Sequence, residues 1–271
     1  MLEQLYYERT ENIGIPIKYS TIKVEKKDGY VIVTLNCPDD MNALSRPMVA
    51  ELMDSFTQIE KDGSVKAVVI TGGNYIFCAG MDLKEMSSLP DGDIDDYFGS
   101  IADFLKMIYS FKKPVIAAVG GIAFGGGFNL ATVCDLIIAS EAARFGHPEI
   151  KFGLNPLFDP LRRIVGHLKA KEITMLGDPV GAKEAAKIGL VNKVAPPDKF
   201  MEKAEKLAKE IAGKPPKAIE AVKRISDIVP RLDKSTALEY EFETTALLFS
   251  RTESKEHLKR FLEELKSRKK K

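Results

Sequence analysis

Two short apolar runs, each closed by glycine, constrain the fold of this chain more than any other feature. Residues 66–71 read KAVVIT and end at two glycines, while residues 115–119 read VIAAV and open a glycine-rich stretch over 120–127. Continuous apolar runs of this length indicate strands that are covered on both faces. Helical patterns lie between and after these runs, and such alternation predicts an α/β fold with parallel strand pairing.

The remaining pattern supplies the partners of these strands. A β-hairpin is predicted over 21–35, because Asp28 and Gly29 form a turn signal between two β-rich runs. Apolar residues recur at helical spacing through 48–59, with Ser45 as the predicted N-cap. A further strand is predicted at 135–139, and further helices at 96–111, 128–134, 182–188, 199–212, 216–228, 236–249 and 255–266. The last third of the chain is therefore expected to be a helical layer.

Charge and composition exclude several classes of partner. The 271 residues include 40 Lys and Arg against 39 Asp and Glu, so no overall field attracts nucleic acid or an anionic membrane. No run reaches the length of about 18 apolar residues that a membrane span requires. The three cysteines and three histidines are widely spaced, without disulfide or metal-ligand patterns. No metal is expected, and a reducing cytoplasm is the expected location.

The glycine-rich stretch over 120–127 admits several interpretations. A dinucleotide fingerprint is rejected because the glycine spacing fails and Asp135 follows too soon, and a phosphate loop is rejected because no lysine follows Gly127. A third interpretation is an oxyanion hole, in which free backbone N–H groups at a helix N-terminus face a developing negative charge. Close packing of a helix against a strand through glycine is the structural alternative.

A second loop strengthens the oxyanion hypothesis. Residues 77–86 again place small residues and glycine after a buried strand, the run at 66–71. Two such loops on adjacent parallel strands meet at the carboxyl edge of the sheet, where α/β proteins bind ligands. Each loop could then supply one N–H group to a shared site.

A set of motifs in a fixed order resembles the crotonase, or enoyl-CoA hydratase/isomerase, superfamily. The matching segments are residues 35–38, 41–45, 67–72, 77–83, 113–119, 124–127, 134–135, 143–149, 176–178 and 185–191. The resemblance implies an α/β fold of the crotonase-like β-β-α superhelix type with a helical C-terminal region. It implies an acyl-CoA thioester as ligand and assembly as a homotrimer or a dimer of trimers.

The same resemblance divides the chain into three parts. Residues 1–19 would form an N-terminal extension, and residues 20–200 an acyl-CoA-binding core. Residues 201–271 would form a helical C-terminal region for trimerisation and pocket closure. Coenzyme A is part of the substrate in this family, so no separate cofactor is expected.

The resemblance also implies the residues of the site. The backbone N–H groups of Met81 and Gly126 would hold the thioester oxygen, and Glu149 would transfer the proton. The implied substrate-binding residues are Asn42, Ala43, Leu44, Ala79, Gly80, Asp82, Gly125 and Gly127. For Asn42, a purely structural role in its own loop is the alternative.

One position departs from the family pattern. The usual hydratase of the family has two glutamates twenty residues apart; Glu149 matches the second, but Asn129 stands at the first. Asparagine can orient water or a carbonyl group by hydrogen bonds, but it cannot exchange a proton at neutral pH. A single carboxylate is sufficient to move a proton between two carbons of an enoyl chain, so double-bond isomerisation is favoured.

Other activities stay open on the same residues. An enoyl-CoA or dienoyl-CoA hydratase would use Asn129 to position water, and decarboxylation or thioester hydrolysis would use the same oxyanion hole. A catalytically silent acyl-CoA-binding protein is the alternative of another class. His147 is expected to support the site or the fold rather than act as a base. Asp159 is either an additional acid or a turn residue before Pro160.

Overall fold

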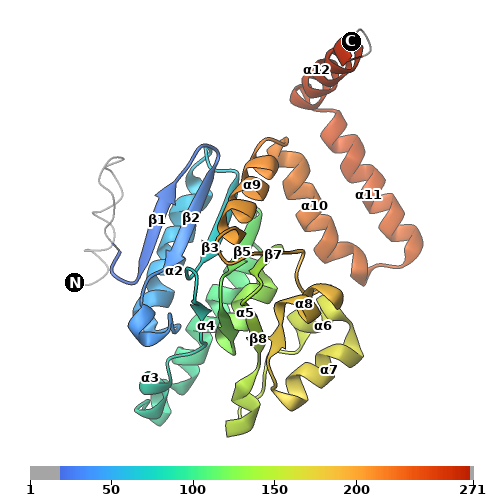
Figure 1. Cartoon of the computed structure of the whole chain (residues 1–271). Helices are drawn as coiled ribbons and strands as arrows, with labels where there is room; N and C mark the ends of the chain where they lie inside the picture. Colours follow the sequence, from blue (N-terminus) through green and yellow to red (C-terminus); the bar gives the residue numbers. More distant parts are fainter. Residues whose placement is uncertain (1–18, 269–271) are drawn as a thin grey trace, which may run out of the picture.

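Two β-sheets and their covering helices form the body of the protein, from which the last two helices extend (Figure 1). The computed structural model describes residues 19–268. The predicted N-terminal extension over 1–19 therefore lies outside the described residues, apart from Tyr19. Within the described part, no helix is long and apolar enough to cross a membrane.

The larger sheet contains both apolar runs as neighbouring parallel strands. Its strands, in spatial order, are β1 (Ile22–Lys26), β2 (Tyr30–Leu35), β3 (Ala67–Thr71), β5 (Val115–Val119), β7 (Leu136–Ser140) and β10 (Lys193–Ala195). Strands β1 and β2 form the predicted antiparallel hairpin, and the other pairs are parallel. Every residue of β3 and β5 is buried. The prediction of an α/β fold with parallel pairing is confirmed.

The smaller sheet was not predicted. It consists of β4 (Ile76–Cys78), β6 (Ile122–Phe124), β8 (Arg144–Gly146) and the antiparallel β9 (Val180–Gly181). Each of its first three strands follows a strand of the larger sheet, so the chain repeats a β-β unit, and α4 and α5 follow two of these units. Strands of two or three residues are too short to show periodicity. For this reason β6 was predicted as loop, within 120–127.

Helices cover both faces of the larger sheet. On one face lie α2 (Arg46–Lys61), α4 (Ile94–Tyr109) and α5 (Gly126–Val133), and on the other lies α9 (Phe200–Ala212). Alternate residues of β3 separate accordingly: Val68 and Ile70 join the first core, Val69 the second. Because α9 completes the second core, the sheet depends on a helix that the sequence assigned to the C-terminal region.

The ends of the predicted helices are close to the observed ones. Ser45 is the N-cap of α2, since its Oγ accepts a hydrogen bond from the amide of Met48 at 3.4 Å. Helix α5 begins at Gly126, two residues before its predicted start. This difference places Gly126 and Gly127 in the first turn of a helix. Helices α3 (Leu83–Ser87), α6 (Asp159–Val165) and α7 (His167–Leu176) were not predicted, whereas α8 (Ala182–Lys187) was.

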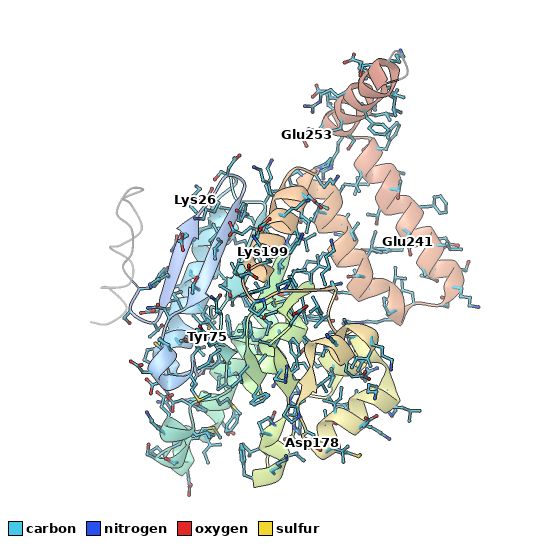
Figure 2. The ribbon with its side chains drawn as sticks, viewed as in Figure 1. Lys26, Tyr75, Asp178, Lys199, Glu241 and Glu253 are labelled. Atoms are coloured by element: carbon cyan, nitrogen blue, oxygen red, sulfur yellow. The ribbon has the colours of Figure 1, made fainter. Side chains whose placement is uncertain are left out.

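The C-terminal helices contact the body mainly through α10. This region contains α10 (Pro216–Ile228), α11 (Lys234–Phe249) and α12 (Thr252–Arg268). Figure 2 shows α11 and α12, labelled at Glu241 and Glu253, standing away from the sheets with side chains on all sides. Several of these side chains are large, apolar and exposed: Leu238, Phe242, Leu247, Phe249, Leu258, Phe261 and Leu262. The helical character predicted for this region is confirmed.

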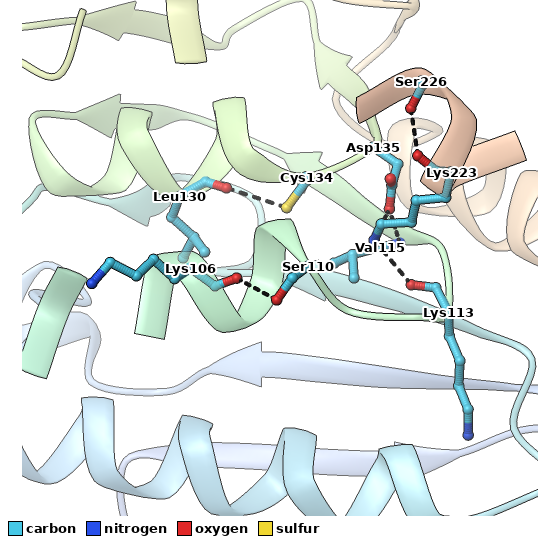
Figure 3. Close-up of polar contacts among 9 residues, drawn as sticks. All are labelled: Lys106, Ser110, Lys113, Val115, Leu130, Cys134, Asp135, Lys223 and Ser226. Atoms are coloured by element: carbon cyan, nitrogen blue, oxygen red, sulfur yellow. Dashed lines mark hydrogen bonds and ion pairs between the residues drawn. The ribbon is translucent and has the colours of Figure 1, made fainter. Parts of the chain in front are cut away.

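Lys223 attaches α10 to the sheet at the start of β7 (Figure 3). Its Nζ donates to Asp135 Oδ2 at 2.8 Å and to the carbonyl of Lys113 at 3.3 Å, and the amide of Val115 donates to the same carboxylate at 2.7 Å. Burial raises the pKa of Asp135, while the nearby Lys223 ammonium opposes that shift. The lysine therefore neutralises a carboxylate that would otherwise be buried without a counter-charge.

Replacing Lys223 should weaken the whole fold measurably. We expect Lys223→Met to lower the free energy of unfolding by about 1–3 kcal/mol, because it leaves Asp135 desolvated without its cation. Urea denaturation followed by circular dichroism measures the change. Lys217→Met is the matched control on the same helix, since it removes only an exposed ion pair with Glu220 and should cost about 0.5 kcal/mol or less. Equal effects of the two substitutions would contradict the role of Lys223.

Candidate active site

The segments 77–86 and 120–127 meet, as the sequence predicted, although each follows a short strand, β4 or β6, that was not predicted. A Cβ atom on Gly80 would lie 3.4 Å from the amide nitrogen of Gly126, and a Cβ atom on Gly126 would lie 3.4 Å from the amide nitrogen of Met81. The two amide groups are therefore neighbours, one from each loop. Met81 lies in the loop after β4, and Gly126 begins α5 just after β6.

Both amides are available to a ligand. Gly126 is the first residue of α5, and the first N–H groups of a helix have no acceptor within it. Across residues 19–268, no oxygen accepts a hydrogen bond from the amide of Met81 or Gly126. The N-terminus of α5 adds its partial positive charge to the same place. Two free donors beside a helix N-terminus can stabilise an oxygen on which negative charge develops.

The sequence left two roles open for the glycines of 120–127, an oxyanion hole and close packing of a helix on a strand. Different glycines fit each role. A Cβ atom on Gly127 would lie 2.1 Å from the carbonyl oxygen of Cys78, so this glycine is required for α5 to pack on β4. Gly125 has φ +49°, in the region that favours glycine. A Cβ atom on Gly125 would also lie 3.2 Å from Glu149 Oε2. Close packing and an accessible amide therefore coexist in one loop.

Glu149 brings a carboxylate to these glycines. It lies in a 3₁₀ turn over Pro148–Phe152 and is the buried residue of that turn, with 6% of its surface exposed. Its Oε1 lies 2.9 Å from Nδ1 of His147, which is fully buried. Its Oε2 has no hydrogen-bond partner in the described part of the chain. One carboxylate oxygen is thus held by the protein, and the other is free beside the glycine loop.

Asn129 lies one turn into α5. It is 8% exposed, and its backbone amide donates to the carbonyl of Gly125 at 2.9 Å. No hydrogen bond joins its side-chain amide to another of the described residues. The amide group is therefore free to bind water or substrate, whereas no second carboxylate occupies this position.

The segment 42–44 supports the loop that contains Met81. The side chain of Asn42 accepts from the amide of Cys37 at 2.9 Å and donates to the carbonyl of Ile76 at 3.0 Å. The amide of Leu44 donates to the carbonyl of Gly80 at 2.8 Å. Asn42 is 1% exposed, so its side chain organises the loop from inside the protein. The side chain of Asn42 therefore has a structural role, which was the alternative to substrate binding.

Other predicted binding residues lie in the loop that contains Met81 or in the segment 42–44 beside it. Ala79 and Met81 are partly exposed, as is Ala43 on the neighbouring segment. Asp82 caps α3, because its Oδ1 accepts from the amides of Lys84 at 2.8 Å and Glu85 at 3.2 Å. Its carboxylate is thus used within the protein, as the side chain of Asn42 is.

Asp159 is held in ion pairs with two arginines of its own helix. It opens α6, and it pairs with Arg162 and with Nε of Arg163, the latter at 2.7 Å. The hydrogen bond from Arg163 lowers the pKa of Asp159. A carboxylate that stays ionised cannot donate a proton, so the hypothesis of an additional acid is not supported. Among residues 19–268, no three His, Cys, Asp or Glu side chains gather closely enough to hold a metal ion.

Comparisons with known proteins identify the family. Residues 25–270 match the family model of enoyl-CoA hydratase/isomerase. A crotonyl-CoA hydratase of Syntrophomonas wolfei is 34% identical over 253 residues, which cover 92% of this chain and 97% of that protein. A short-chain-enoyl-CoA hydratase of Clostridium acetobutylicum is 35% identical, with 92% and 97% covered.

The fold agrees with these sequence comparisons. The crystal structure of an enoyl-CoA hydratase from Bacillus anthracis superposes with a TM-score of 0.87 at 32% identity, covering 90% of this chain and 97% of that one. The family model, both relatives and the crystal structure each match about nine-tenths of the chain. The chain belongs to the enoyl-CoA hydratase/isomerase family, the crotonase superfamily.

Proposed function

We propose that this enzyme moves a proton along the acyl chain of an enoyl-CoA thioester, with Glu149 as the acid-base residue. The observation that carries the proposal is the free Oε2 of buried Glu149, which lies beside Gly125, the residue before Gly126, whose amide neighbours that of Met81. A base and two oxyanion donors are the groups that enolate chemistry requires. A silent binding protein would have no need of a buried carboxylate with a free oxygen.

The proposed reaction is a shift of the double bond. Glu149 Oε2 takes a proton from the α-carbon of a 3-enoyl thioester, and the electron pair of that C–H bond moves toward the thioester oxygen. The amides of Met81 and Gly126 stabilise the dienolate. Glu149 then returns the proton two carbons away, the electron pair moves back, and a 2-enoyl thioester forms. No proton is gained or lost overall, so one carboxylate is sufficient.

Hydration is the second candidate, because the relatives named above are hydratases. In that reaction the free amide of Asn129 would hold a water molecule while Glu149 takes its proton, as the water oxygen adds to the β-carbon. The α-carbon would then receive the proton. Isomerisation remains our first choice, since Asn129 cannot itself exchange a proton.

The substrate would be bound mainly through backbone. The side chains of Asn42 and Asp82 are used within the protein, so the loops over 42–44 and 79–82 would present peptide groups to the coenzyme A part. Coenzyme A arrives with the acyl group, and the proposed chemistry needs no further cofactor.

We also propose that three copies assemble, singly or as a dimer of trimers. The exposed apolar side chains of α11 and α12 are grouped on helices that leave the body of the chain. Large exposed apolar side chains gathered in one region are usual at protein interfaces. Copies of the chain are the expected occupants, as the family resemblance implies.

Glu149→Gln should leave the fold intact and abolish most of the activity. The amide keeps the size of the carboxylate but cannot exchange a proton, so we expect kcat to fall by at least about 10²-fold. Absorbance assays with 2-enoyl-CoA and 3-enoyl-CoA thioesters measure turnover, and calorimetry with an acyl-CoA thioester checks binding. Glu60→Gln is the matched control, since it makes the same chemical change at an exposed residue that pairs with Lys112, before β5 and therefore at the end of that strand opposite the glycine-rich stretch. Near-normal turnover of Glu149→Gln would remove Glu149 from its role.

Asn129→Glu should introduce or increase hydration of a 2-enoyl-CoA thioester. A second carboxylate there could hold and deprotonate the attacking water, although its burial would destabilise the protein. The loss of absorbance of the conjugated thioester reports hydration. Asn129→Gln is the control for side-chain length and should not raise it. High hydratase activity in the unaltered protein would favour the second candidate over isomerisation.

Sedimentation velocity of the full chain should give three or six times the mass of one chain. We expect Phe242→Glu to shift this distribution toward single chains, because Phe242 is 72% exposed on α11 and a buried charge would disfavour an interface. Glu243→Gln, at the next position of the helix, should leave the distribution unchanged. A single-chain mass for the unaltered protein would refute the assembly.

A further inference from the structure

His147 is a buried polar residue to which the proposed reaction assigns no step. Its Nδ1 lies 2.9 Å from Glu149 Oε1, and both side chains are buried. Nε2 of His147 and Oε2 of Glu149 are two of the three buried side-chain atoms without a hydrogen-bond partner in the described part of the chain. His147 and Glu149 therefore contact each other through one atom each, and each has one further polar atom without a partner.

The chemistry of the pair settles which atom donates. A glutamate that is ready to accept a proton is a carboxylate, and a carboxylate has acceptors only. The proton of the contact must then be carried by Nδ1 of His147, which donates to Oε1. This assignment makes the two oxygens of Glu149 inequivalent, because Oε1 is occupied and Oε2 faces Gly125.

The imidazole is itself fixed by the helix that presents the oxyanion donor. Its ring lies against the ring of Phe128 in α5, with 4.7 Å between centroids and 35° between planes. Phe128 follows Gly126 and Gly127 and packs also on Phe145 of β8, at 5.7 Å. The contact of His147 thus links the carboxylate to the helix that begins at Gly126.

We propose that His147 is a positioning residue that holds Glu149 with Oε2 toward the substrate. Oε2 is then the single oxygen that both takes and returns the proton. The inference rests on the proposed function, since it gives the acid-base residue its orientation. Without the Nδ1 donor, the glutamate side chain can adopt other rotamers, and fewer of them place an oxygen at the reacting carbon.

Three substitutions separate this role from simple packing. His147→Asn keeps an N–H donor near the place of Nδ1, His147→Gln moves the donor further along the side chain, and His147→Leu removes it while keeping apolar volume. We expect His147→Leu and His147→Gln to lower kcat by about 10- to 10²-fold with KM changed less than about 2-fold, as for a misplaced catalytic group. His147→Asn should recover most of the loss. The proposal would be overturned if His147→Asn and His147→Leu lowered kcat equally, or if His147→Leu did not lower kcat.

A spectroscopic measurement on the unaltered protein is independent of turnover and of variant folding. Labelling the three histidines with ¹⁵N should show one ring with its proton on Nδ1 and slow exchange with water. This signal should be absent from His147→Asn and shifted in Glu149→Gln. A proton on Nε2 of His147 alone would refute the proposal whatever the kinetics.

The outcomes distinguish this proposal from the proposed function. If the function is wrong, Glu149→Gln retains full turnover. If only the role of His147 is wrong, Glu149→Gln still loses activity while His147→Leu does not. Circular dichroism and calorimetry with an acyl-CoA thioester confirm that each variant is folded and binds.

Discussion

Close approach of backbone to backbone is the constraint on which the rest of this structure depends. Cβ atoms on Gly120, Gly121 and Gly127 would lie between 1.7 and 2.1 Å from the carbonyl oxygens of Gly73, Tyr75 and Cys78. Only residues without a side chain allow the segment after β5 to lie this close to the segment after β3. The smaller sheet forms as a result, and the loops that end its strands bring the amides of Met81 and Gly126 together. Close packing of the backbone thus places the two N–H donors of the candidate site next to each other.

The carboxylate of Glu149 is placed at some energetic cost. Burial of a charged group without full hydrogen bonding is unfavourable, and one of its oxygens has no partner. The contact with His147 offsets part of this cost, while the second oxygen has no partner in the described part of the chain. A site that binds and releases protons needs such an incompletely satisfied group, and the surrounding close-packed glycines and aromatic rings hold it in place. The proposed site thus combines two backbone amides with one unpaired carboxylate oxygen.

The helices of the C-terminal region make less contact with the body of the protein from α9 to α12. Helix α9 completes the second core of the larger sheet, α10 is attached through the ion pair of Lys223 with Asp135, and α11 and α12 expose apolar side chains. Within this region, α9 and α10 are therefore the helices that contribute to the stability of the single chain. The last two provide surface for further copies of the chain in the proposed assembly.

The sequence by itself determined the elements whose signals are local. Continuous apolar runs predicted β3 and β5, Ser45 predicted the start of α2, and glycine after both strands predicted that two loops would meet. The tertiary structure decided the rest, because strands β4, β6, β8, β9 and β10, with two or three residues each, acquire their conformation from their neighbours. The pairing of His147 with Glu149 likewise depends on a short turn held against Phe128. The hydrogen bonds of the Asn42 side chain depend on residues thirty or more positions away. Motifs identify residue types, whereas contacts between distant segments decide which polar atoms of those residues are left without a hydrogen-bond partner.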